Sequence, residues 1–148
     1  INNYVAELLK NKTEQILKLK IHKMTKQGIQ RYIQEMIGSV EGMISLTIIS
    51  DESGEVLAYE SKDSNIDNQL AASFQIEVLR QISRGLNYVD NLNDKSINDI
   101  VITTPEQLHF IFSSENRDMI AHLIADSKRT SEGMVKLIHK KYKKDLTL

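Results

Sequence analysis

Apolar residues in this chain recur at helical spacing in some segments and at strand spacing in others, and the order of these segments predicts the fold. From residue 3 to about residue 24 they recur every three to four positions, with an interruption at Lys12 and Thr13. Gln27 and Gly28 end this pattern, and a shorter helix follows with its apolar residues on one side. The sequence therefore predicts two helices before the first strand.

Five short segments have the apolar and β-branched composition of strands. Two of them are apolar on both sides, which predicts strands with both faces covered. Residues 51–54 (DESG) are a hairpin-turn signal, and Pro105 stands at a favoured turn position. The predicted strands are residues 45–50, 55–61, 97–103, 108–113 and 119–125.

The segment from residue 66 to about residue 88 predicts a long helix with a wide apolar surface. At roughly 100° per residue, apolar side chains fill about two-thirds of its circumference. A helix that lies on a sheet with its back in water needs a narrower stripe, so we expect this helix to bury a second face. A last helix follows it, with Ser127, Thr130 or Ser131 as the cap. The polar arc of the long helix is formed by Gln69, Ser73, Glu77, Arg80, Gln81 and Arg84.

The composition excludes several classes of function. The chain has 148 residues, 41% hydrophobic and 26% charged, which is typical of one globular domain. The absence of cysteine excludes disulfides, thiolate zinc sites and cysteine nucleophiles. The glycines form no dinucleotide- or phosphate-loop motif, and no common hydrolase motif is present. We therefore expect a cytoplasmic protein that is not an enzyme and has no catalytic residues or cofactor.

Two histidines are candidates for a metal site. If Ser113 pairs with Asp118 across the last hairpin, His109 lies opposite His122. Two imidazoles would still need a third and a fourth ligand, and no acidic residue is evident nearby on that face. We therefore predict hydrogen-bonded structural histidines and no metal.

Charge is segregated along the chain. Residues 1–39 carry a net charge of +4, residues 40–118 a net −9 and residues 119–148 again +4. The basic ends would suit an anionic membrane surface or an acidic partner, and lysines near a helix C-terminus also suit the helix dipole. The near-neutral total and the eight aromatic residues argue against nucleic acid as a partner.

The order of these elements resembles that of the Roadblock/dynein light chain family, whose domains are related to longin and profilin-like folds. The segment Ser39–Ser61 (SVEGMISLTIISDESGEVLAYES) resembles the opening of such a domain. It contains a Val-x-Gly, an apolar strand, an Asp-x-x-Gly turn and a second strand. The resemblance covers about residues 29–142.

This resemblance implies an α/β (α+β) fold with a five-stranded antiparallel sheet sandwiched by helices. The long helix would cover one face and the terminal helices the other. It also implies a homodimer, or a heterodimer with a related domain, in which long helices pack side by side and the strand 97–103 is a paired edge. The residues expected in this interface are Ala72, Ile76, Leu79, Ser83, Ile97, Asp99 and Val101.

Family members are scaffolds that bind Ras-like small GTPases, so the resemblance implies a GTPase as a partner. The polar arc would receive it, through Gln69, Ser73, Glu77, Arg80 and Arg84. No arginine can be singled out as a catalytic finger, so stimulation of GTP hydrolysis would rest on family analogy alone.

Residues 1–27 have no counterpart in the minimal family domain, so we expect an N-terminal helical extension before a roadblock-like domain at residues 29–148. Two other functions stay open. A PAS- or GAF-like sensor would bind a small ligand in a cavity. An adaptor would act through the N-terminal helix alone.

Overall fold

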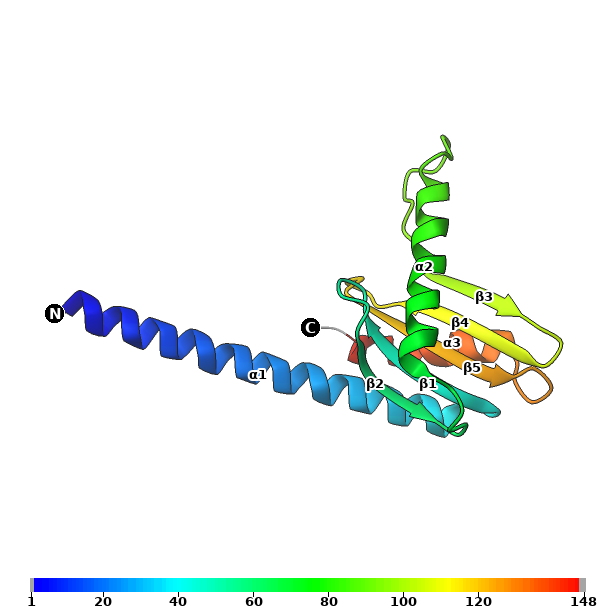
Figure 1. Ribbon diagram of the computed structural model, residues 1–148, viewed down its shortest axis with the longest axis horizontal. Helices are drawn as coiled ribbons and strands as arrows, with labels where there is room; N and C mark the ends of the chain where they lie inside the picture. The colour runs from blue at the N-terminus through cyan, green and yellow to red at the C-terminus, as the bar shows by residue number, and fades with distance from the viewer. Residues whose placement is uncertain (1, 147–148) are drawn as a thin grey trace.

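A computed structural model describes residues 2–146 of the chain (Figure 1). One very long helix leads into a sheet with two further helices and a short 3₁₀ turn. The elements are α1 (Asn2–Ser39), β1 (Met43–Ser50), β2 (Val56–Ser61), α2 (Asn68–Leu86), β3 (Asp99–Thr103), β4 (Gln107–Ser113), β5 (Met119–Asp126), α3 (Glu132–Tyr142) and η1 (Lys143–Asp145).

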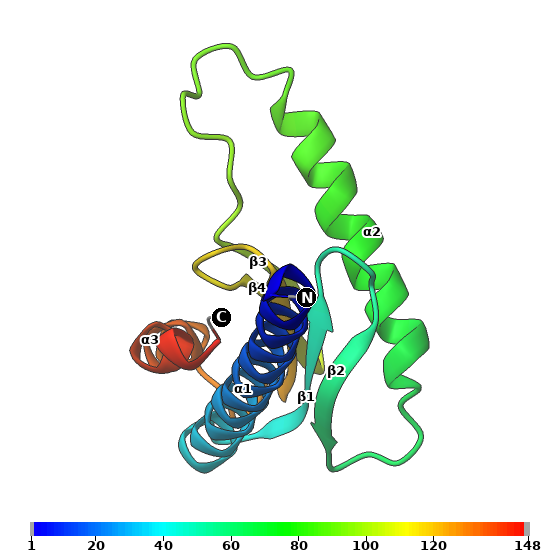
Figure 2. The same ribbon diagram turned by 90° about the vertical axis from the view of Figure 1, so that its left-hand side faces the viewer.

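The five strands form one antiparallel sheet in the order β2-β1-β5-β4-β3. Helix α2 lies on one face, and α1 and α3 lie on the other (Figure 2). The predicted α/β fold, a sheet sandwiched by helices, is therefore confirmed. β1 and β5 are central and almost wholly buried, which explains why their sequences are apolar on both sides.

The main core lies between the sheet and the terminal helices. The C-terminal part of α1 contributes Ile29, Tyr32, Ile33 and Met36, and α3 contributes Val135. A smaller core lies between the sheet and α2. It consists of the buried side chains of Ile49, Ala72, Ile76, Ile111 and Ile120.

The prediction of two helices before β1 is wrong, because α1 runs through Gly28 without a break. The glycine has a packing role instead of a terminating one. The backbone of η1 crosses α1 at this point, and a Cβ added at Gly28 would collide with the carbonyl oxygen of Asp145. A residue with no side chain is therefore required for close approach, although it weakens the helix locally.

The N-terminal part of α1 extends away from the domain (Figures 1 and 2). Within residues 2–27 no side chain is buried, and large apolar side chains such as Leu9, Ile16 and Leu19 are exposed. Lysines interrupt the apolar positions around the helix, as the broken stripe predicts. This projecting part is continuous with the part of α1 that enters the core, and the predicted division into an extension and a domain stays a prediction.

Two helices of the main core are joined by a buried hydrogen bond. The Tyr32 hydroxyl of α1 lies 2.7 Å from Nδ1 of His139 in α3. The His139 ring stacks on Phe112 of β4, with 3.9 Å between ring centroids. Burial raises the pKa of Tyr32 well above its usual range. It also lowers the pKa of His139 to about 4, with the positive charge of Lys143 adding to the effect.

The histidine pair of the sheet has a different register from the predicted one. His109 lies opposite Ile124, and His122 lies opposite Ile111, so the two histidines are diagonal neighbours. Their rings still stack, with 3.3 Å between Nδ1 of His109 and Nε2 of His122. Burial, with a smaller contribution from His109, lowers the pKa of His122 to about 4.

Alanine at Gly28 should destabilise the domain, because the new Cβ would force η1 away from α1. We expect a loss of roughly 1–3 kcal/mol of unfolding free energy, as for other overpacked sites. Gly38→Ala is the matched control. It lies in the same helix with open space around it, and should be neutral or stabilise by up to about 1 kcal/mol. Urea unfolding of both variants measures the difference, and equal effects would contradict the close approach.

Acid should destabilise the protein before its carboxylates titrate. His122 and His139 have a pKa of about 4 in the folded chain, against 6.5 without perturbation. The unfolded chain therefore binds more protons below about pH 6.5, so stability is complete above that pH and falls as the pH approaches 4. We expect a loss of roughly 2–4 kcal/mol between about pH 7 and pH 5. Urea unfolding measures the loss, and imidazole NMR titrations with midpoints near 6.5 would contradict it.

Candidate functional site

Helix α2 is anchored at its N-terminus. The Asp67 carboxylate accepts a hydrogen bond from the backbone N–H of Leu70, at 3.0 Å, and caps the helix. Thr47 of β1 donates a hydrogen bond to the side-chain oxygen of Asn68, at 3.2 Å. These contacts fix the helix over β1 and β2, while its C-terminal half extends past the sheet (Figures 1 and 2).

Three arcs of different chemistry run along α2. The first faces the sheet, where Ala72 and Ile76 are buried and Leu79 is half-buried. The second is polar. The third, which we name the exposed apolar face, consists of Leu70, Phe74 and Ile82, while Val78 between them is half-buried and packs against the smaller core. The exposed fractions are 55% for Leu70, 64% for Phe74 and 46% for Ile82.

The sequence predicts a second apolar face on α2 but places it on the wrong side of the helix. Ala72 and Ile76, both predicted for a dimer interface, are already buried against the sheet of their own chain. Ser83 lies on the same arc as Ala72 and Ile76, but it is exposed because this part of the helix extends past the sheet. The apolar side chains that remain to be covered belong to the exposed apolar face. Pairing of α2 with the α2 of a second copy stays a prediction, but the residues now expected in the interface are those of the exposed apolar face.

The loop after α2 adds exposed apolar side chains that sequence reasoning did not select. Tyr88 is 88% exposed, and Val89 and Leu92 are also exposed. They follow the helix directly, on the part of the chain that extends past the sheet. The sequence signal that could have identified these side chains is the presence of apolar residues in a loop rich in Asn and Asp.

The polar arc of α2 has the residues predicted for a partner. Gln69, Ser73, Glu77, Arg80 and Arg84 are all exposed. Arg84 pairs with Glu77, with 3.1 Å between Nη2 and Oε1. Exposed pairs of this kind contribute little stability, so the arc is free to exchange them for contacts with a partner. Its role in binding stays a prediction.

Strand β3 occupies an edge of the sheet, as predicted. Val101 packs against the main core, and Ile97, just before the strand, is half-buried. The Asp99 carboxylate pairs with Lys136 of α3 at 3.5 Å. The outer backbone edge of β3 has no strand beside it in the described residues, which leaves it open to pairing with another chain.

Residues 2–146 contain no group of three or more His, Cys, Asp or Glu side chains that could hold a metal ion. The stacked pair of His109 and His122 therefore lacks the further ligands that a zinc site needs. Gln107 instead lies 3.0 Å from Nε2 of His109.

No helix within the described part of the chain is both long and apolar enough to cross a membrane. Several lysines of the basic C-terminal region take part in ion pairs, such as Lys143 with Glu115 at 3.4 Å. Peripheral membrane contact through the basic terminal helices stays a prediction.

Comparison with known proteins identifies the fold. No protein-family model matches the chain, and no curated protein matches its sequence. Solved structures do match. MglB of Myxococcus xanthus is 16% identical with a TM-score of 0.64, and the match covers 79% of this chain and 86% of that one. The gliding protein MglB of Thermus thermophilus is 14% identical with a TM-score of 0.70, over 82% and 87%.

A third neighbour is a Roadblock/LC7 domain from Streptomyces avermitilis. It is 13% identical with a TM-score of 0.57, and the match covers 78% of this chain and 91% of that domain. These identities are low, so the likeness concerns the fold. This chain therefore contains a roadblock-like domain.

Proposed function

We propose that this chain is a non-enzymatic dimeric scaffold that binds a Ras-like small GTPase. The exposed apolar face of α2 carries the proposal. Leu70, Phe74 and Ile82 are large side chains left about half exposed or more, in a row along one side of a helix. A contiguous apolar surface of this kind on a folded domain marks a protein interaction site.

A second copy of the chain is the occupant that fits this face best. Because the face is a narrow helical stripe, two copies of α2 would cover one another by packing side by side. The open edge of β3 is a second self-complementary element, since two antiparallel edge strands can pair across a two-fold axis. The likeness of the fold to a structure described as MglB with tetrameric arrangement supports association between copies of the chain.

The polar arc of α2 is our proposed contact for the GTPase. It lies beside the apolar stripe, so it would remain exposed at the margin of a helix-to-helix interface. Arg80 and Arg84 give it cationic groups, while Glu77 gives it an acidic one. The likeness to a gliding protein supports a regulatory role. Stimulation of GTP hydrolysis is not part of the proposal.

Two alternatives remain outcomes of the tests. A PAS- or GAF-like sensor needs a cavity inside the fold, and here large side chains such as Tyr32, Phe110 and Phe112 fill the main core. An adaptor that acts through residues 1–27 alone is supported by the exposed apolar side chains of that extension. If the protein is such an adaptor, deletion of residues 1–27 should abolish all binding to partner proteins.

Phe74→Glu should convert a dimer into a monomer, because the new carboxylate would be buried in the helix-to-helix interface. The wild-type protein should have a mass near twice 16.9 kDa in native mass spectrometry and sedimentation. Arg80→Glu is the matched control, since it changes charge on the polar arc of the same helix and should leave the dimer intact. A wild-type monomer would contradict the dimer, and a monomer with a discrete added mass would favour the sensor.

The GTPase prediction concerns the polar arc. Arg80→Glu combined with Arg84→Glu should weaken binding of the Ras-like GTPases encoded in the same genome by about tenfold or more, because a rim charge reversal creates repulsion. Surface plasmon resonance with the GTPases loaded with GDP or a GTP analogue measures this. Lys62→Glu is an exposed control in the loop before α2, outside the polar arc. Equal binding by both variants would remove the polar arc from the proposal.

A further inference from the structure

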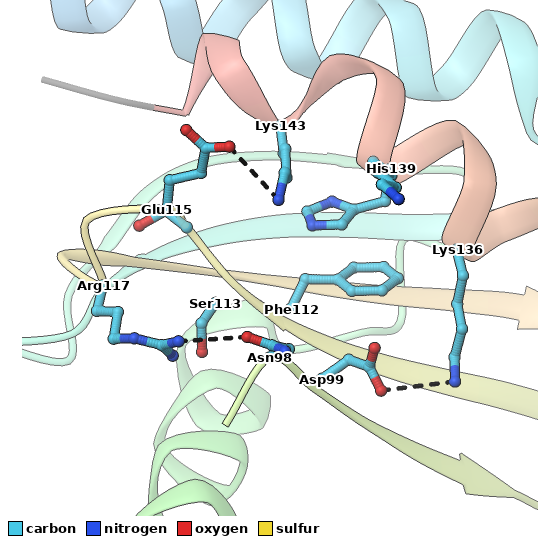
Figure 3. A pocket seen from close by; sticks show the side chains of 11 residues that line it. Asn98, Asp99, Phe112, Ser113, Glu115, Arg117, Lys136, His139 and Lys143 are labelled. Carbon is cyan, nitrogen blue, oxygen red and sulfur yellow. Dashed lines mark hydrogen bonds and ion pairs between the residues drawn. The ribbon is translucent and has the colours of Figure 1, made fainter. Parts of the chain in front are cut away.

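A cavity of about 550 Å³ lies between α3 and the end of the sheet formed by β3 and β4 (Figure 3). Helix α3, which forms one wall, covers the face of the sheet opposite α2 (Figure 2). The cavity is therefore distinct from the exposed apolar face of α2 and from the polar arc beside it. Its volume lies within the range of small-molecule sites.

The cavity has an excess of positive charge. Four cationic side chains line it, against two carboxylates. These residues are Arg117, Lys136, Lys140, Lys143, Asp99 and Glu115.

Ion pairs account for only part of this charge. Lys136 lies 3.5 Å from Asp99 and 3.4 Å from Glu132 of its own helix. Lys143 lies 3.4 Å from Glu115 across the cavity. All three ion pairs are partly exposed and therefore weak, so an anion with more than one oxygen could draw Lys143 toward itself.

Arg117 and Lys140 form no direct ion pair with a carboxylate in the described residues, although the positive charge of Arg117 helps to lower the pKa of Asp94. Arg117 donates to the carbonyl oxygen of Ile97 at 2.6 Å and to the side-chain oxygen of Asn98 at 3.2 Å, and both acceptors are neutral. Lys140 is exposed and has no carboxylate partner within residues 2–146. The two cations approach the cavity from different elements, the β4–β5 turn and α3.

A buried histidine gives the cavity a directed donor. His139 lines it and is only 7% exposed. Its Nδ1 faces the Tyr32 hydroxyl, which lies in the core with no other hydrogen-bond partner in the described residues. A buried hydroxyl proton needs an acceptor, so Tyr32 donates to Nδ1 and the ring proton lies on Nε2.

The position of this donor is fixed. Stacking on Phe112 at 3.9 Å and the bond to Tyr32 together hold the imidazole ring in place. Nε2 has no partner within the described chain, and in Figure 3 the ring lies between Lys143 and Phe112 at the cavity. Such a preorganised donor loses little entropy when it binds a ligand.

We propose that this cavity binds a soluble small molecule through a phosphate monoester group. The group would accept hydrogen bonds from Nε2–H of His139 and from Lys140, with Lys143 and Arg117 adding positive charge. Its charge of about −2 matches the excess of two cations. Phosphate oxygens point in several directions, as do these donors. The remaining volume accommodates the rest of a phosphorylated metabolite.

The test follows the imidazole signals of His139 by NMR during titration with glycerol phosphate, and separately with inorganic phosphate, at constant ionic strength. We expect a saturable shift of the His139 signals, while those of His22, on the projecting part of α1, stay unchanged. Lys140→Ala should weaken binding by about tenfold, the usual effect of losing one charge-assisted bond. Lys141→Ala is the matched control, because Lys141 is on the same helix but outside the cavity.

Three results would overturn the proposal. One is the absence of a saturable His139 shift with either phosphate compound. Another is equal weakening by Lys140→Ala and Lys141→Ala, which would mean a general response to helix charge. The third is binding to vesicles that contain phosphatidic acid without binding of soluble glycerol phosphate, which would assign the cations to a membrane surface.

Discussion

The hydrogen bond between Tyr32 and His139 joins the two terminal helices over β4, and the packing of the main core is built around it. Tyr32 comes from α1, His139 from α3, and Phe112, on which the histidine stacks, from β4. Three elements far apart in sequence are thereby fixed relative to one another. Because each partner would be an unsatisfied buried polar group alone, the bond also specifies a single arrangement of the helices. The same hydrogen bond occupies Nδ1 of His139 and leaves the other ring nitrogen, Nε2, at the cavity.

Periodicity alone predicts the sheet and its flanking helices, because burial on one or two faces leaves a local mark on each segment. The strand segments and the long helix were recognisable for this reason, and Ser131, one of the three predicted candidates, caps α3. Gly28 shows where local reasoning fails. Glycine is required at this position because the backbone of Asp145, more than a hundred residues away in sequence, approaches it closely. The residues beside Gly28 in the helix give no indication of this contact.

The candidate site was harder to predict than the fold, because it depends on the rotation of α2 about its own axis and on the pairing register of the strands. The wide apolar surface of α2 was evident, but the hydrogen bond between Thr47 and Asn68 helps set which third of it meets the sheet. That choice buries Ala72 and exposes Phe74. A shift of two residues in the β4–β5 register likewise moved His109 from a position opposite His122 to a diagonal one. Neither the rotation of the helix nor the strand register can be predicted from the hydrophobic pattern of a single segment.

Strand β3 lies between the open edge of the sheet and the cavity beside α3. Its outer edge is open, while Asp99 at its start reaches Lys136 on the wall of the cavity. The strand has only five residues and pairs with a neighbour on one side only, so either contact would act on a weakly held element. A ligand that draws the lysines of α3 inward would alter the pull of Lys136 on β3. Ligand binding and strand pairing would then be linked, and each would have to change the affinity of the other by the same factor.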